Sequence, residues 1–194
     1  SCTHVIDCPH STPTYLDDGI FCARTMHIKD GIYLDGEASF VSEKQYRERI
    51  ARLEPQAGDI IFTREAPVGE AFLIPSRMKV CLGQRVMLLR PNTERLIGRF
   101  LLSQIYSGAV NDRISQLTAG TTNPHLNVSE VKQFELPLPR PDEQGLILVS
   151  VTAIDEKVSR ESKEALKLAT LKSGLMDDLL TGRVRVTDLI QGGD

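Results

Sequence analysis

The spacing of apolar residues divides the chain into two regimes. From residue 1 to about residue 140, glycine and proline interrupt short apolar runs at close intervals, which predicts a mixture of strands and helices. Between residues 142 and 181 there is no proline, and glycine occurs only at positions 145 and 174. This second regime predicts one long helix.

Short apolar runs bounded by glycine or proline predict the strands of the first regime. They cover residues 19–23, 32–34, 59–63, 70–74 and 85–89. Residues 134–138 are also expected to be extended. Pro137 and Pro139 confine that segment to a sheet edge or an irregular stretch.

Helix signals lie between these strands. Ser42 and Gln45 form a capping box, which predicts a helix over about 42–53. Further helices are expected over 94–106, over 109–117 and directly after Asn127. Because strands and helices do not alternate regularly, the order predicts an α+β fold rather than a doubly wound sheet.

The long helix opens with Pro141-Asp142-Glu143, which suits the first turn of a helix and the positive end of its dipole. Its apolar residues trace one stripe, interrupted by Glu161 and shifted in phase near Leu171. About 39 residues give a rod of roughly 58 Å, too long to bury its stripe on a 140-residue globule. We therefore expect a second helix to pair with it; a helix lying flat on its own domain is the alternative. The stripe consists of Ile147, Val151, Ile154, Val158, Ala165, Leu168, Leu171, Leu175 and Leu179.

Composition excludes several classes of protein. Apolar residues make up 41% and charged residues 25% of the 194, as in ordinary globular chains. No apolar run approaches the ~20 residues that span a bilayer, and no secretion signal is visible. The four cysteines are too scattered for a disulfide scaffold. We expect a cytoplasmic protein with reduced thiols and no membrane association.

The formal net charge of −3 conceals a basic stretch. Residues 77–113 hold seven basic side chains and two acidic ones. Such a stretch can form a positive surface for phosphates, or simply a solvated face of an ordinary domain.

Metal-dependent chemistry is not supported by the spacing of candidate ligands. Cys2 and His4, with Cys8 and His10, make two C-x-H pairs, but not in a usual zinc pattern. We expect Cys8 to be a small buried group and His10 a polar loop contact. Asp142 and Glu161 imitate a nuclease motif, yet a helix would separate them by ~28 Å. We predict no metal site and no catalytic residues in this chain.

Methyltransferase, phosphate-loop and hydrolase motifs are also missing, so the sequence indicates a binding protein. Two loops, 11–15 and 120–125, are rich in small hydrogen-bonding side chains suited to phosphates. Arg64 and Glu65 place a guanidinium and a carboxylate at the end of a strand, where they could form hydrogen bonds with base edges. The predicted DNA-binding residues are Ser11, Thr12, Thr14, Tyr15, Arg24, Arg64, Lys79, Arg85, Thr121, Thr122, Asn123 and His125.

Several motifs, taken together and in order, resemble one half of the specificity subunit of type I restriction–modification enzymes. They are Asp7-Cys8-Pro9-His10-Ser11-Thr12-Pro13, Gly58-Asp59-Ile60-Ile61, Gly120-Thr121-Thr122, Leu136-Pro137-Leu138-Pro139 with Glu143-Gln144, Gly174-Leu175-Met176, and Leu179-Leu180-Thr181-Gly182-Arg183-Val184-Arg185-Val186. Singly each motif is short, but as a set they cover nearly the whole chain. The family carries two such units in a full subunit, whereas this chain holds one.

The resemblance implies a target recognition domain over residues 1–140 that reads double-stranded DNA. It implies a conserved spacer helix with a short tail over 141–194, which pairs antiparallel and docks methyltransferase subunits. S-adenosylmethionine, ATP and Mg²⁺ are then expected on the methyltransferase and restriction subunits, with no cofactor in this chain.

Two hypotheses follow for this chain. In the first, two copies pair through the apolar stripe and read a palindromic, interrupted DNA site, because protein symmetry is mirrored in the target. In the second, the chain is a coiled-coil adaptor whose globular part binds protein instead of DNA.

Overall fold

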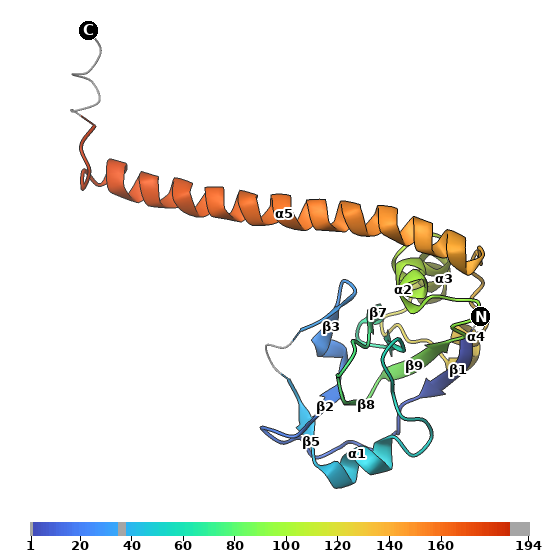
Figure 1. Ribbon diagram of the computed structural model, residues 1–194. Coiled ribbons are helices and arrows are strands. Elements are labelled where there is room, and N and C mark those ends of the chain that lie inside the picture. The colour runs from blue at the N-terminus through green and yellow to red at the C-terminus, as the bar shows by residue number, and fades with distance from the viewer. Residues whose placement is uncertain (1, 35–37, 187–194) are drawn as a thin grey trace. The chain divides into compact units, whose positions relative to one another are not determined.

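The structure is a computed structural model that describes residues 2–34 and 38–186. The polypeptide divides into two compact units, Ser1–Leu146 and Ile147–Asp194. The first contains strands and short helices, and the second contains most of one long helix (Figure 1). The predicted α+β class is confirmed.

A four-stranded antiparallel sheet in the order β1-β9-β6-β7 forms the centre of the first unit. Its strands are β1 (Cys2–Asp7), β6 (Ile60–Arg64), β7 (Val68–Leu73) and β9 (Val86–Pro91). The sequence predicted β6, β7 and β9 to within two residues at each end, but not β1.

Two smaller sheets complete the strand arrangement. The order β5-β2-β8 joins β5 (Phe40–Val41), β2 (Ile20–Ala23) and β8 (Val80–Leu82), and β2 runs parallel to β8. A short hairpin joins β3 (Ile28–Lys29) and β4 (Ile32–Tyr33), after a 3₁₀ turn over Thr25–His27. Residues 134–138 belong to no strand, so the irregular alternative holds for that segment.

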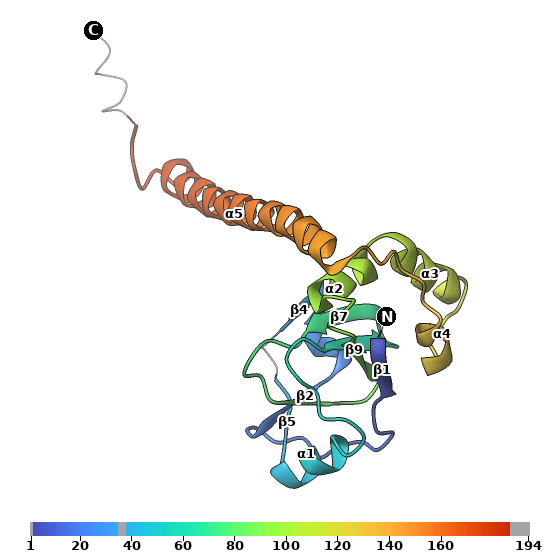
Figure 2. The ribbon, with the colours of Figure 1, turned by 45° about the vertical axis from the view of Figure 1, so that its right-hand side comes forward.

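Helices α2 (Gly98–Tyr106), α3 (Gly108–Thr118) and α4 (Val128–Lys132) follow the strands along the chain (Figure 2). Gly108, expected to separate two helices, is instead the first residue of α3. The helix expected directly after Asn127 is confirmed, and it begins with a capping box in which Glu130 accepts a hydrogen bond from the Asn127 amide at 2.7 Å.

The four-stranded sheet is apolar on both faces, because successive side chains of a strand point to opposite sides. Ile61, Leu88 and Phe72 belong to a buried cluster shared with β2, β3 and β8. On the opposite face, Phe62 and Leu89 line a cavity of about 450 Å³ together with residues of α2, α3 and α4. The sheet is therefore buried between the helices and the smaller sheets.

Helix α1 (Glu43–Arg49) is shorter than predicted and ends four residues before 53. Its cap is as expected, because Ser42 Oγ accepts from the Gln45 amide at 3.3 Å. The Gln45 side chain, however, pairs with the main chain of Thr14, at 2.8 and 2.9 Å, in the amide orientation that satisfies both of its ends. The capping box is thus only half formed.

Gln144 fixes the join between the strands and the long helix. The side chain is fully buried, and it donates to the Arg95 carbonyl at 2.7 Å and to the Pro139 carbonyl at 2.8 Å. Its oxygen accepts from the amide of Ile97 at 2.9 Å. Ile97 is the N-cap of α2, so a residue 47 positions later supplies that helix with its missing acceptor. α2 begins at Gly98, four residues later than the predicted start at 94.

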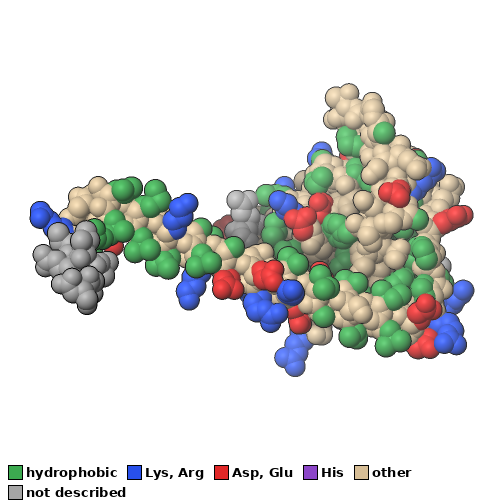
Figure 3. Space-filling view, turned by 90° about the horizontal axis from the view of Figure 1, so that it is seen from above, with side chains coloured by type: hydrophobic (Ala, Val, Ile, Leu, Met, Phe, Trp, Pro, Cys, Tyr) green, Lys and Arg blue, Asp and Glu red, His purple; other side chains and the backbone are tan. Residues whose placement is uncertain are grey.

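The long helix, α5 (Pro141–Leu180), has 40 residues and begins at the predicted proline. The apolar stripe is exposed along it, with Ile154 at 61%, Leu168 at 58% and Leu175 at 50%. Apolar side chains recur along the rod between charged ones (Figure 3). Among the described helices, none is both long enough and apolar enough to cross a membrane.

Candidate nucleic-acid interface

Four loops meet at one edge of the four-stranded sheet, and we call them the loop cluster: residues 8–19, 64–68, 83–85 and 119–127. The antiparallel order causes this convergence, because β1 and β6 end at the same edge at which β7 and β9 begin. Main-chain hydrogen bonds join the loops. The Cys8 amide donates to the Val86 carbonyl at 3.2 Å, and the Leu126 amide donates to the Arg64 carbonyl at 2.8 Å.

Arg49 of α1 donates hydrogen bonds to the main chain of loop 8–19. Arg49 is only 7% exposed, and its guanidinium donates to the Ser11 carbonyl at 3.0 Å, the Pro9 carbonyl at 3.5 Å and the Leu82 carbonyl at 2.6 Å. The carbonyls of the loop therefore point inward, while the side chains of Ser11 and Thr12 stay exposed. A buried arginine thus supports the predicted phosphate-binding hydroxyls.

Several predicted side chains are brought together beside that loop. The amide of Gln84 donates to Thr12 Oγ1 at 2.9 Å, and the Arg24 guanidinium carbon lies 4.6 Å from the centre of the Tyr15 ring. Arg85 is exposed and has φ of 66°, a left-handed conformation that is uncommon outside glycine. This conformation lies at the turn between β8 and β9, in the middle of the loop cluster.

Arg64 is the most constrained of the predicted residues. Its side chain is 17% exposed, with Nε 3.4 Å from Asp7 Oδ1 and Nη2 3.7 Å from Glu65 Oε1. Glu65 also forms an isolated antiparallel bridge with His125, which ties loop 119–127 to the end of β6. His10 Nε2 lies 3.8 Å from Asp7 Oδ2, so the expected polar contact of His10 is present.

Loop 119–127 presents the remaining predicted side chains. Thr121, Thr122, Asn123 and His125 are all exposed. The Thr121 hydroxyl donates to the Thr118 carbonyl at 2.8 Å, continuing the end of α3 into the loop. These four residues therefore lie in the same cluster as the hydroxyls of loop 8–19.

Lys79 lies outside the loop cluster. It precedes β8, whereas Gln84 and Arg85 follow that strand at its other end. Its ammonium is 3.1 Å from Glu43 Oε2 and 4.4 Å from the centre of the Tyr46 ring. The structure thus places Lys79 outside the loop cluster and pairs it with an acid of α1.

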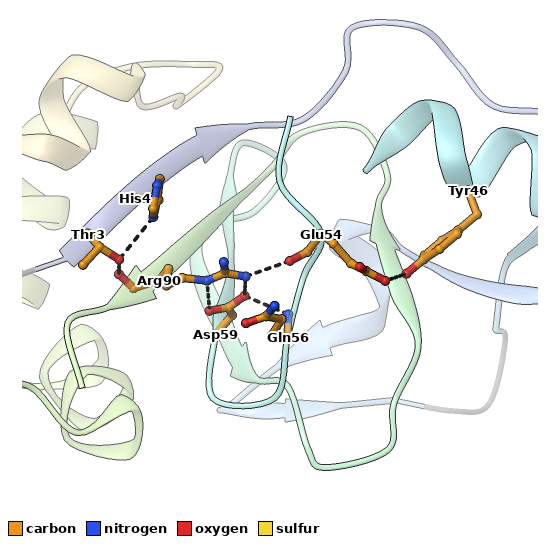
Figure 4. Close-up of polar contacts among 7 residues, drawn as sticks. All are labelled: Thr3, His4, Tyr46, Glu54, Gln56, Asp59 and Arg90. Carbon is orange, nitrogen blue, oxygen red and sulfur yellow. Dashed lines mark hydrogen bonds and ion pairs between the residues drawn. The ribbon is translucent and has the colours of Figure 1, made fainter. Parts of the chain in front are cut away.

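The basic stretch over 77–113 does not form one surface. Arg90 makes a bidentate ion pair with Asp59, at 2.8 and 2.7 Å, and also donates to the Glu54 carbonyl at 2.7 Å (Figure 4). The Gln56 amide donates to the same Asp59 carboxylate at 2.8 Å. The positive charge of Arg90 is therefore neutralised inside the fold, and its hydrogen bond to Asp59 raises the pKa of the guanidinium further. The Gly58-Asp59 motif is structural for this reason.

The 450 Å³ cavity lies apart from the loop cluster. Its lining is mostly apolar, with Thr3, His4 and Lys132 as polar members, and it includes none of the predicted DNA-binding residues. Cys8, at 2% exposure, is buried as expected. Among the described residues no group of three or more potential ligands could hold a metal ion.

Comparison with known proteins assigns the family. The type I restriction modification DNA specificity domain matches residues 25–168. The chain belongs to this family. The MjaX and MjaVIII type I restriction enzyme specificity subunits of Methanocaldococcus jannaschii are 28% identical over 66% of the chain and 24% identical over 90%.

Solved structures agree at the level of the fold. The HsdS subunit of Thermoanaerobacter tengcongensis aligns over 90% of the chain with a TM-score of 0.58 and 18% identity. A chain from a type I restriction–modification complex aligns over 64% with a TM-score of 0.50. The chain spans less than half the length of these proteins, covering 29% and 42% of the two curated relatives and 45% of the HsdS chain.

Proposed function

We propose that this specificity domain reads a short sequence of double-stranded DNA through the loop cluster and directs partner methyltransferase and restriction subunits to it. The observation that carries the proposal is that four loops holding ten of the twelve predicted residues meet at one edge of the sheet, with Arg24 stacked on Tyr15 of one of these loops. Exposed hydroxyls, the amide of Asn123 and the exposed Arg85 lie there, which are the groups that contact phosphates and base edges. Adenine methylation, ATP use and cleavage then belong to the partner subunits.

Arg85 provides the sharpest test of the proposed surface. We expect Arg85→Ala to weaken binding of a target duplex by ~1–3 kcal/mol, since its guanidinium is exposed in the centre of the cluster. Arg77 is a matched control, because it too is exposed and has a positive φ, of 76°, but it lies between β7 and β8 at the other edge of the sheet. Equal losses of DNA-binding free energy in Arg85→Ala and Arg77→Ala would refute the loop cluster as the DNA-binding surface.

The adaptor alternative makes a different prediction about salt. Phosphate contacts release counterions, so DNA affinity should fall steeply between low and moderate salt. Fluorescence anisotropy with a labelled duplex at both salt concentrations measures this slope. Because methyltransferase subunits complete the proposed clamp, the titration should be run with and without the co-expressed subunit. Absence of DNA binding in both formats would favour the adaptor.

We also propose that two copies of the chain pair through α5 in antiparallel orientation. The exposed apolar stripe supports this proposal, because a soluble chain seldom leaves so long a row of leucine, isoleucine and valine unpaired. Light scattering at tens of micromolar should give the mass of a dimer.

A further inference from the structure

Two charged residues, Glu161 and Lys172, interrupt the α5 stripe at the same four-three spacing that its apolar residues follow. In a coiled coil, the positions that face the partner helix are spaced alternately by four and three residues, and we call them core positions. From Ile147 onward this spacing runs through Val151, Ile154 and Val158. Continued without any slip, the same spacing reaches Glu161 and Lys172, as well as the apolar positions 165, 168, 175 and 179. The phase shift expected near Leu171 is therefore unnecessary: the heptad pattern is regular, and two of its core positions are charged.

These two charges are opposite and lie at equal distances from one point of the helix. Glu161 and Lys172 are symmetric about the midpoint between Leu166 and Lys167. Reflection about that midpoint also exchanges other core positions in pairs: Ala165 with Leu168, Val158 with Leu175, and Ile154 with Leu179. A two-fold axis at this midpoint would bring each of these pairs together in an antiparallel dimer.

We propose that α5 pairs with a second copy of this chain in one antiparallel register, in which Glu161 of each copy faces Lys172 of the other. This inference rests on the proposed dimer and specifies its geometry. Each pair joins the first core position of one heptad with the fourth of the other, as antiparallel coiled coils require. Small and large side chains also face each other at Ala165 and Leu168.

The shape and charge of the α5 surface support a second copy of α5 as its partner. A groove runs along the second half of α5, and Lys172 lines it among apolar neighbours. The side chain of Glu161 is 64% exposed, and 3.8 Å separates it from Lys157 one turn earlier. The groove residues are Leu168, Leu171, Lys172, Leu175, Met176, Leu179 and Leu180.

Competing arrangements leave the charges unmatched. Sliding the partner by one heptad in one direction places Lys172 against Ile154 and Glu161 against Ala165. Sliding it in the other direction places Glu161 against Leu179. A parallel, in-register pair would set Glu161 against Glu161 and Lys172 against Lys172. A buried polar position specifies coiled-coil register and orientation at a cost to stability, and a buried charge without a partner costs most. Of these arrangements, only the proposed register gives both charges an opposite partner.

Exchange of the two charges tests the register. Glu161→Lys places two lysines opposite each other at both symmetric sites, and we expect the dimer dissociation constant to rise about tenfold or more. Lys172→Glu should do the same with two glutamates. A mixture of the two single variants should form a heterodimer with an affinity within about threefold of the unaltered pair, because every cross-pair is then opposite in charge.

Matched controls lie on the outer face of the same helix. Glu156→Lys and Lys163→Glu change the charge by the same amounts at positions that point away from the proposed seam, and should leave the dissociation constant unchanged. Sedimentation equilibrium on the full chain measures all five proteins and the mixture. Rescue in the mixture also shows that each single variant folds.

The outcomes separate the two levels of the proposal. If the unaltered chain stays monomeric at tens of micromolar, the dimer itself is refuted. If the unaltered chain dimerises but the single variants do not weaken it, or their mixture shows no recovery, the dimer stands and this register is overturned.

Discussion

Removal of the Asp59 carboxylate tests whether the Gly58-Asp59 motif is structural. In Asp59→Ala the guanidinium of Arg90 loses both ion-pair hydrogen bonds, at 2.8 and 2.7 Å, and the amide of Gln56 loses its acceptor. The aspartate side chain is 4% exposed and the arginine side chain 18%. The variant therefore leaves a largely buried cation without its counter-charge.

The size of the effect follows from that burial. Removing one partner of a buried ion pair costs ~3–5 kcal/mol, because the remaining charge stays desolvated. Arg90 keeps its hydrogen bond to the Glu54 carbonyl and a little solvent contact, which places the expected loss near the lower end, about 3 kcal/mol. For a chain of this length such a loss lowers the melting temperature by about 6–12 °C.

Urea unfolding followed by circular dichroism measures the loss as a change in the transition midpoint at constant slope. Asp142→Ala is the control, because Asp142 pairs with Arg140 at a similar distance of 2.9 Å but is 66% exposed. An exposed pair contributes ~0–1 kcal/mol. If Asp59→Ala shifts the midpoint no more than Asp142→Ala does, the buried ion pair does not hold this part of the fold, and the structural reading of the motif fails.

Three further predictions concern single side chains. Gln144→Ala should lower the free energy of unfolding by about 2–3 kcal/mol in the same urea assay, since it leaves buried main-chain groups without partners. Burial, and then the neighbouring Glu70 carboxylate, raises the pKa of Tyr106 to about 12. The folded state thus holds this proton more tightly than the unfolded state, so stability should fall as pH rises from 10 toward 12, and less so in Tyr106→Phe. Arg64→Ala should cost ~1–3 kcal/mol of DNA binding and relax the choice of one base if Arg64 reads a base edge; an equal loss on all duplexes would indicate phosphate contact alone.

The sequence predicted the elements that carry a strong local signal. The apolar runs of β6, β7 and β9 and the periodic stripe of α5 were identified because hydrophobic spacing alone determines such elements. β1 was missed because polar Thr3 and His4 occupy its exposed half, and β8 because three residues give no recognisable period. The N-cap amide of α2 is bonded by Gln144, which lies 47 residues later in the chain, so no local pattern could have located this contact.

The candidate site was less accessible to sequence reasoning than the fold. Arg64, Lys79, Arg85 and Arg90 all lie in or beside strands, and composition does not distinguish them. The structure does, because Arg64, Lys79 and Arg90 have acidic partners on distant elements while Arg85 is exposed at the turn between β8 and β9. Convergence of the four loops depends on the strand order β1-β9-β6-β7, which the apolar pattern of single strands does not specify.

A fixed register of α5 would matter for DNA reading because it sets a distance. One heptad of slip moves the partner helix by ~10.5 Å along its axis, at 1.5 Å per residue. Since duplex DNA rises 3.4 Å per base pair, a slip along the DNA axis would correspond to about three base pairs between the two sequences. The displacement is the same however each globular unit is oriented on its own helix. Apolar side chains alone would tolerate such a slip, whereas Glu161 and Lys172 would oppose it, so two charged residues in the seam would determine how far apart the two halves of the target lie.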